Sequence, residues 1–272
     1  MATSAEVAEI RAATGQLVTL AGRELDEFWE ALFNSLDPIE FRDELLRFFP
    51  ELVTVYGDTA GVIGADWYEL TRRAARQGVT AAQFQAVIAM PAPDEQSIAA
   101  AKWALGPMFD EQANSTLSLA RLHGSLQRLV QQPFRDSIWY AAASDPVRTG
   151  VLRMPSGAET CKFCVMLASR GPVYSVSASG ASTAGAVLGR GSNRTGFDAS
   201  GRRLSGGIGG GIKARGKQPV GNSYHDGCDC VPVLIRSAAD YPADYDQEYF
   251  EQLYREGSGV GRDIPQGGTL DV

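Results

Sequence analysis

The segments CKFC (161–164) and YHDGCDC (224–230) contain all four cysteines of the chain and one of its two histidines. A Cys-x-x-Cys pair places two sulfur ligands on one tight turn, and a second ligand group from elsewhere completes a tetrahedral shell. Because zinc takes thiolate and imidazole ligands in closed four-coordinate sites, the two segments predict a structural zinc ion that joins them. The five candidate ligands for its four positions are Cys161, Cys164, His225, Cys228 and Cys230.

The sequence leaves further states of these side chains open. Four cysteines permit two disulfides, but the N-terminus lacks the pattern of an export signal, and a reducing compartment disfavours disulfides. The thiols could also form a redox-active pair with Cys161 as the low-pKa member, or stay unmodified. His225 is either a ligand or a hydrogen-bond donor to a thiolate, so the identity of the four ligands stays open.

Residues 1–145 predict a helical domain, because apolar residues recur there at three- and four-residue steps. The segment DPIE (37–40) has an N-cap aspartate followed by proline, which predicts the start of a second helix. Pro50, the GP pair at 106–107 and Pro133 predict interruptions. The tryptophans lie within helical patterns and are expected in the core: Trp29, Trp67, Trp103 and Trp139.

Residues 146–236 change character and predict a small α+β module with a short strand on each side of the cysteine segments. The module includes a glycine-rich basic loop at 180–222, which cannot bury enough apolar surface to fold alone. Residues 237–272 are acidic and predict one short amphipathic helix followed by a tail. The fold class expected is therefore mainly α, with a zinc-stapled α+β module.

The glycine-rich loop carries seven basic residues and one acidic residue between positions 181 and 223. One interpretation is a solvated linker. The other is contact with packaged DNA or with an acidic protein face, since arginines spaced by glycine can follow phosphates without reading sequence. The basic residues are Arg190, Arg194, Arg202, Arg203, Lys213, Arg215 and Lys217.

Composition and motifs argue against several other classes of protein. The formal net charge of −7 opposes general coating of nucleic acid. No apolar run approaches the length of a membrane span, so no membrane association is expected. The sequence has no phosphate-binding loop, no G-x-S-x-G motif and no H-E-x-x-H motif. We therefore expect no enzymatic activity.

The two segments with their flanks, ETCKFCVMLASRGPVY and YHDGCDCVPV, resemble the phage head morphogenesis family, the minor capsid proteins typified by the F protein of bacteriophage Mu. The variant present here is similar to the actinobacteriophage branch. The matching positions are Glu159, Thr160, Cys161, Cys164, Leu167, Gly171, Tyr174, His225, Cys228, Cys230 and Pro232. The match covers about a quarter of the chain, and the long basic loop departs from the shorter members.

This resemblance implies a virion component of the capsid interior, present in the host cytoplasm during assembly. The implied partners are the portal protein and the major capsid or scaffold protein, with packaged DNA as a further partner of the basic loop. Two hypotheses from different functional classes stay open beside it. One is a zinc-dependent hydrolase or thiol redox enzyme, and the other is a DNA-binding zinc module delivered with the genome.

Overall fold

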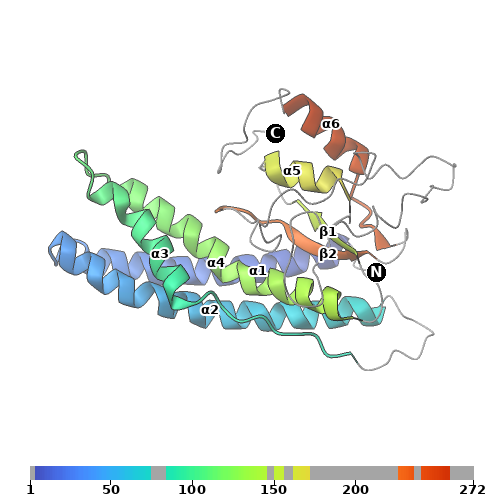
Figure 1. Cartoon of the computed structure of the whole chain (residues 1–272), viewed down its shortest axis with the longest axis horizontal. Coiled ribbons are helices and arrows are strands. Elements are labelled where there is room, and N and C mark those ends of the chain that lie inside the picture. The colour runs from blue at the N-terminus through green and yellow to red at the C-terminus, as the bar shows by residue number, and fades with distance from the viewer. Residues whose placement is uncertain are drawn as a thin grey trace.

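The computed structural model describes residues 4–74, 84–145, 150–155, 162–171, 226–235 and 240–257, and these form a mainly helical protein with one small sheet (Figure 1). The expected fold class is confirmed. The elements are α1 (Ser4–Leu32), α2 (Pro38–Ala74), α3 (Asp94–Leu105), the 3-10 turn η1 (Gly106–Met108), α4 (Ser115–Ser144), β1 (Gly150–Met154), α5 (Lys162–Ser169), β2 (Val231–Ile235) and α6 (Gln247–Gly257).

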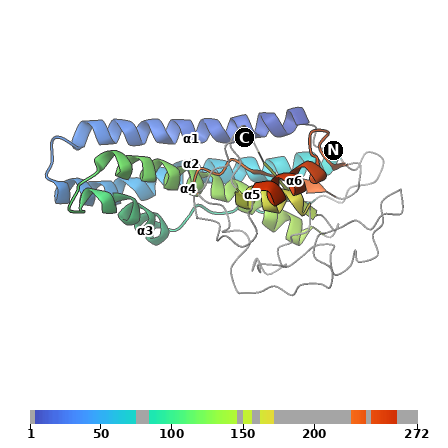
Figure 2. The same cartoon turned by 90° about the horizontal axis from the view of Figure 1, so that it is seen from above.

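The long helices α1, α2 and α4 run along the long axis of the molecule, and α3 packs against one end of α2 and α4 (Figures 1 and 2). Helices α2 and α4 approach each other closely at Gly64, where an added Cβ would lie 2.3 Å from the carbonyl oxygen of Phe134. The apolar core at the α3 end consists of Ala21, Leu25, Trp29, Phe41, Leu45, Phe49, Leu52, Val53, Ala92, Ala101, Ala104, Leu105, Leu122, Leu126, Leu129 and Val130.

The start of α2 follows the sequence prediction. The carboxylate of Asp37 accepts hydrogen bonds from the backbone N–H groups of Ile39 (2.8 Å) and Glu40 (3.0 Å), and the Glu40 carboxylate accepts one from the Asp37 N–H (3.4 Å). This reciprocal arrangement is a capping box, and it satisfies N–H groups that the first turn leaves without partners.

The prolines have different effects from those expected. The break at 106–107 is confirmed, because α3 ends at Leu105 and a 3-10 turn follows. The breaks expected at Pro50 and Pro133 are wrong, since α2 and α4 continue through both residues. A proline removes one helical hydrogen bond. We attribute the continuity to burial of the neighbouring Phe49 and Phe134, which favours one straight packed helix over a kink.

Strands β1 and β2 form an antiparallel pair in which Leu152 lies opposite Val233 and Arg153 opposite Pro232. The two predicted strands are therefore confirmed. They are almost completely buried and share a core with the helices (Figure 1). This core contains Val7, Ala60, Ala65, Trp67, Tyr68, Ala86, Phe134, Ile138, Trp139, Ala141, Val151, Leu152, Met154, Val231, Val233, Leu234 and Ile235. The domain boundaries expected from the sequence stay a prediction.

Helices α5 and α6 lie side by side next to the sheet (Figures 1 and 2). The last carbonyl groups of α5 accept hydrogen bonds from the segment that leads into α6: the Tyr245 hydroxyl donates to Ala168 (2.6 Å), and the Gln247 side chain donates to Ser169 (3.0 Å). These contacts satisfy carbonyls that a helix end leaves without intrahelical partners. The predicted C-terminal amphipathic helix is confirmed as α6.

Three of the four tryptophans lie in the core as expected, but Trp103 is 55% exposed and stacks against the guanidinium of Arg121. The residue pattern around Trp103 correctly predicted a helix, but the expectation that Trp103 is buried was wrong. None of the helices in the described part of the chain combines the length and the apolarity that a membrane crossing requires.

Candidate metal centre

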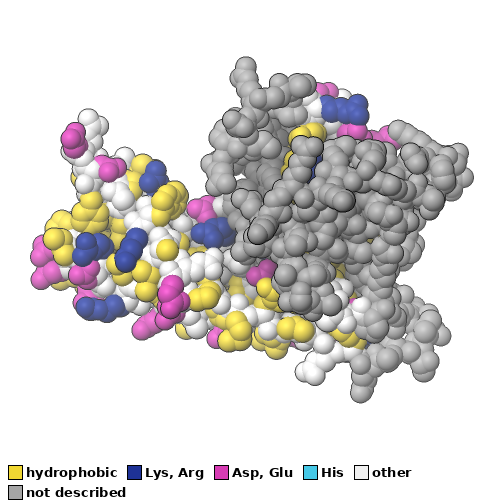
Figure 3. All heavy atoms as spheres, in the orientation of Figure 1, with side chains coloured by type: hydrophobic (Ala, Val, Ile, Leu, Met, Phe, Trp, Pro, Cys, Tyr) yellow, Lys and Arg dark blue, Asp and Glu magenta, His cyan; other side chains and the backbone are white. Residues whose placement is uncertain are grey.

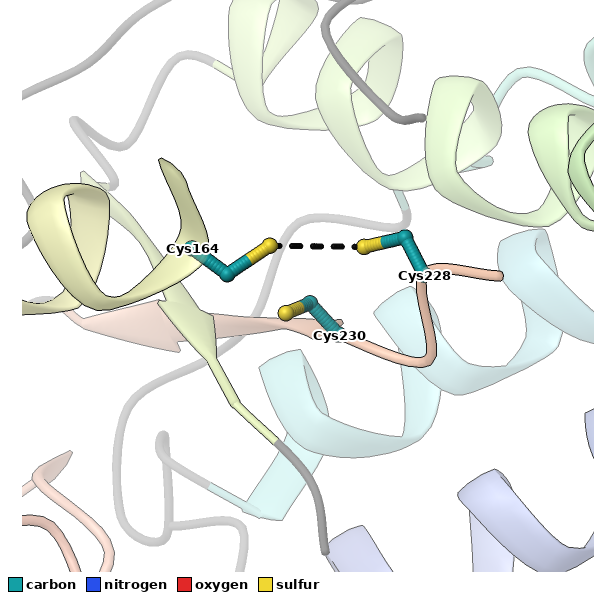
Figure 4. A group of neighbouring side chains, drawn as sticks. All are labelled: Cys164, Cys228 and Cys230. Atoms are coloured by element: carbon teal, nitrogen blue, oxygen red, sulfur yellow. Dashed lines mark hydrogen bonds between the residues drawn. The ribbon is translucent and has the colours of Figure 1, made fainter. Parts of the chain in front are cut away.

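Cys164, Cys228 and Cys230 bring their sulfur atoms together from two segments far apart in the sequence (Figure 4). The three sulfur atoms lie within 4.8 Å of one another. Their residues are 1%, 3% and 4% exposed. A buried group of three soft ligands supplies three of the four positions that a structural zinc site requires. The structure therefore has three of the five predicted ligands in place to hold a metal ion.

The local chain geometry explains how Cys228 and Cys230 face the same way. They flank Asp229, which is exposed, so burial alternates along the segment that enters β2, as in extended backbone. Gly227 precedes them with a φ of 76°, in the left-handed region that a residue with a Cβ rarely adopts. The turn at Gly227 directs the chain from Asp226 into the cysteine pair.

Cys164 is presented by α5, whose buried Val165 and Ala168 pack the helix onto the protein. The Sγ atoms of Cys164 and Cys228 lie 3.4 Å apart. A disulfide bond needs about 2.05 Å, so these sulfurs are not bonded to each other. Tetrahedral coordination at a zinc–sulfur distance of about 2.3 Å separates two sulfurs by about 3.8 Å. The spacing therefore fits a shared metal ion after a small adjustment.

The thiols interact electrostatically as well as sterically. The neighbouring thiol of Cys164, followed by that of Cys228 and by burial, raises the pKa of the Cys230 thiol. In the absence of a metal ion Cys230 therefore keeps its proton at neutral pH. A metal ion takes up thiolates, so its binding would release protons and become weaker in acid.

Helix α4 holds the segment that carries Cys228 and Cys230. The Arg128 guanidinium pairs with the carboxylate of Asp226 at 2.6 Å, and the side chain of Gln127 donates to the carboxylate of Asp229 at 2.5 Å. The buried guanidinium of Arg135 donates to the backbone carbonyl of Cys228. The helix backbone is close enough that a Cβ at Gly124 would lie 3.1 Å from the Cβ of Asp226.

A third arginine reaches the same region from α1. The guanidinium of Arg11 donates to the carbonyl of Pro155, at the end of β1, over 3.2 Å. Burial is the largest effect on Arg11 and lowers its pKa, while the nearby carboxylates of Asp244 and Asp229 oppose this effect. The centre therefore lies at a junction of α1, α4, α5 and the strands.

The remaining predicted site residues lie outside the described part of the chain. Cys161 directly precedes α5 and His225 directly precedes Asp226, so both are adjacent in sequence to the group. The predicted nucleic-acid or portal contacts also lie outside it: Arg190, Arg194, Arg202, Arg203, Lys213, Arg215 and Lys217.

Sequence reasoning missed the contribution of α4. Gly124, Arg128, Gln131 and Arg135 recur at steps of four, three and four, which places them on one helix face. On a helix whose other inward-facing residues are apolar, a glycine and three polar residues along one face indicate that a loop packs there. This pattern does not reveal which loop docks.

The comparisons with known proteins point to phage proteins. A family model described as VG15 protein matches residues 1–257. The Gene 15 protein of Mycobacterium phage D29 is 32% identical over 131 residues, which are 47% of this chain and 44% of that relative. The chain thus aligns with less than half the length of the curated relative. No solved structure matches. Because the family match includes the helices and both cysteine segments, the chain belongs to the VG15 protein family, a family of phage proteins.

Proposed function

We propose that this protein is a minor structural component of a phage head, acts in head assembly near the portal, and has no enzymatic activity. Membership of a phage protein family supports the phage setting. The resemblance of both cysteine segments to the head morphogenesis family supports the assembly role. The proposed locations are the host cytoplasm during assembly and the capsid interior afterwards.

The observation that carries the proposal of a structural rather than an enzymatic role is the burial of three converging thiols against the helices. A catalytic zinc keeps one position open to substrate, whereas a structural zinc is enclosed by four protein ligands. Thiols that are 1–4% exposed favour the enclosed kind. We propose zinc as the metal, with Cys161 or His225 as the fourth ligand, and its chemistry there is to hold the two cysteine segments together.

Contact with portal, capsid or scaffold proteins is proposed for the helical half. Its surface carries several exposed apolar side chains, and Figure 3 shows apolar groups interspersed with both signs of charge over the helices. Such surfaces favour contact between proteins over binding to a polyanion. The exposed apolar residues of α2 and the following segment are Ile39, Val55, Val62, Leu70, Val87, Ile88 and Met90.

The metal is tested by elemental mass spectrometry on protein purified without chelator. We expect about one zinc ion per wild-type chain and much less in Cys228→Ser. Asp43→Asn is the control, because this exposed carboxylate pairs with Arg42 on the surface of α2 and the variant should keep the metal. Absence of metal in the wild-type chain would overturn the zinc centre. X-ray absorption that found three protein ligands and a water would favour the hydrolase hypothesis.

The assembly role is tested by deleting the gene from the phage or prophage that encodes the chain. We expect defective heads and a loss of infectious particles, restored by a plasmid copy of the wild type but poorly by Cys228→Ser. Mass spectrometry of purified particles should detect the chain. Normal infectivity together with absence from the particles would overturn the proposal. DNA binding that weakens with salt and disappears on deletion of 190–217 would instead support the nucleic-acid hypothesis.

A further inference from the structure

Arg135 places a buried positive charge directly beside the candidate metal centre. The residue is 1% exposed, in the middle of α4. Its guanidinium donates to the backbone carbonyl of Cys228 and to the side-chain oxygen of Gln131, the latter over 2.5 Å. A buried arginine is stabilised by acceptors for its hydrogen bonds and by nearby negative charge. The contact with Cys228 places the charge of Arg135 at the cysteine segment.

The metal centre itself would supply negative charge there. Three thiolates around a divalent cation have a net charge of −1, and a fourth thiolate from Cys161 makes it −2. Burying a net charge is unfavourable unless an opposite charge lies nearby. The guanidinium of Arg135 contacts the backbone of the residue that carries one of these sulfurs, so it is placed to offset that charge.

The same contact also fixes geometry. The carbonyl of Cys228 lies between the two cysteines of the C-x-C pair, so a donor that holds it restrains the backbone from which both sulfurs project. On either side, Arg128 pairs with Asp226 and Gln127 donates to Asp229. These two contacts are more exposed than that of Arg135, and solvent weakens them. The contact of Arg135 is therefore the best shielded from solvent of the three attachments to α4.

We propose that Arg135 is a positioning residue of the metal centre, which holds the Cys228 carbonyl and compensates the charge of the metal–thiolate group. This inference rests on the proposed metal centre. It assigns to the helical half a direct part in metal affinity, because α4 supplies this residue while α5 and the segment before β2 supply the sulfurs.

The test compares Arg135→Gln, Arg135→Lys and the wild type by zinc competition against a chromophoric chelator. We expect Arg135→Gln to weaken zinc binding by about 10- to 100-fold, the usual effect of losing a group that supports a metal ligand. Arg135→Lys keeps the charge and should recover part of the affinity. Arg121→Gln is the matched control, because Arg121 lies on the same helix against Trp103 and should leave the affinity unchanged.

A purely structural role is distinguished by thermal unfolding with zinc and with chelator. If Arg135 acts on the metal centre, Arg135→Gln lowers Tm much more with zinc than with chelator; if it only supports the helices, the two decreases are equal. If the wild type binds zinc, equal decreases in Tm, or an Arg135→Gln variant with the zinc affinity of the wild type, would overturn this inference alone. A wild type that binds no zinc would overturn the centre with it. If Arg135→Gln does not fold, Arg135→Lys carries both measurements.

Discussion

The α3 end of the helices and the cysteine segments are held together in opposite ways. At the α3 end, sixteen buried apolar side chains from several helices form one core. At the other site the buried group consists, among the described residues, of three cysteines, and polar side chains of α4 contact the segment that carries two of them. Apolar volume tolerates small rearrangements, whereas thiols and a buried guanidinium need defined partners. The comparison teaches that one chain can be stabilised by apolar packing at one site and by specific polar and thiol contacts at another.

The largest effect is expected at a buried ion pair that joins the ends of α2 and α4. Arg72 of α2 and Asp145 at the end of α4 have side chains 4% and 0% exposed, with Nε and Oδ2 2.6 Å apart. Arg72→Gln leaves the carboxylate without its charged partner and should lower the free energy of unfolding by about 3–5 kcal/mol. Urea denaturation measures this change.

The neighbouring residue offers a matched comparison for that prediction. Arg73 pairs with Glu69 on the exposed surface at 3.4 Å. Arg73→Gln should therefore change the free energy of unfolding by less than about 1 kcal/mol. Similar losses in both variants would mean that the Arg72–Asp145 pair has no special role at the end of the helices.

Gly64→Ala tests how tightly α2 packs against α4. The added methyl group would lie 2.3 Å from the carbonyl oxygen of Phe134, so α2 and α4 would have to separate. We expect a loss of about 3 kcal/mol, at the upper end for overpacking. Gly15→Ala, where nothing lies within 4 Å, should instead stabilise α1 by about 0.5–1 kcal/mol. A harmless Gly64→Ala would contradict the close approach of the helices.

The buried carboxyl group of Asp136 on α4 should make the stability of the protein depend on pH. Burial raises its pKa from 3.8 to about 6, against the hydrogen bond from Gln132 and the charge of Arg135, which both lower it. The folded protein therefore binds more protons than the unfolded chain between about pH 4 and pH 6, and stability falls as the pH rises through that window. Asp136→Asn should remove this slope and stabilise the protein by about 3 kcal/mol at pH 7.

Unfolding measured at pH 4, 5, 6 and 7 in both chains checks this expectation. The variant and the wild type should differ least near pH 4, where the wild-type carboxyl is protonated in the folded protein and about half protonated in the unfolded chain. A wild type whose stability shows no greater fall than the variant between pH 4 and pH 6 would contradict the assignment to Asp136.

The smallest effect is expected at Gly227, in the turn before the cysteine pair. Its φ of 76° is unfavourable for a residue with a Cβ, but no atom of the described residues lies within 4 Å of the added group. Gly227→Ala should therefore cost about 1 kcal/mol from backbone strain alone. Hydrogen exchange should locate the loss at β2 and the cysteine segment, with α1 to α3 unaffected. A loss spread evenly over the helices would show that the two regions are not separable.

The sequence by itself determined the elements and the candidate ligands. Periodic apolar residues predicted the helices, the capping box at Asp37 predicted the start of α2, and β-branched runs predicted β1 and β2, because these signals act over a few residues. The cysteine spacing identified Cys164, Cys228 and Cys230 for the same reason, since two ligand pairs with this spacing are rare outside metal sites.

Only the tertiary structure decided which faces are buried and what supports the sulfurs. Pro50 and Pro133 stay within helices and Trp103 faces solvent, because packing between helices outweighs local propensity. The docking of Asp226, Cys228 and Asp229 on α4 joins residues about a hundred positions apart. Contacts at that separation depend on how whole helices are placed, and no local pattern of residues encodes this placement.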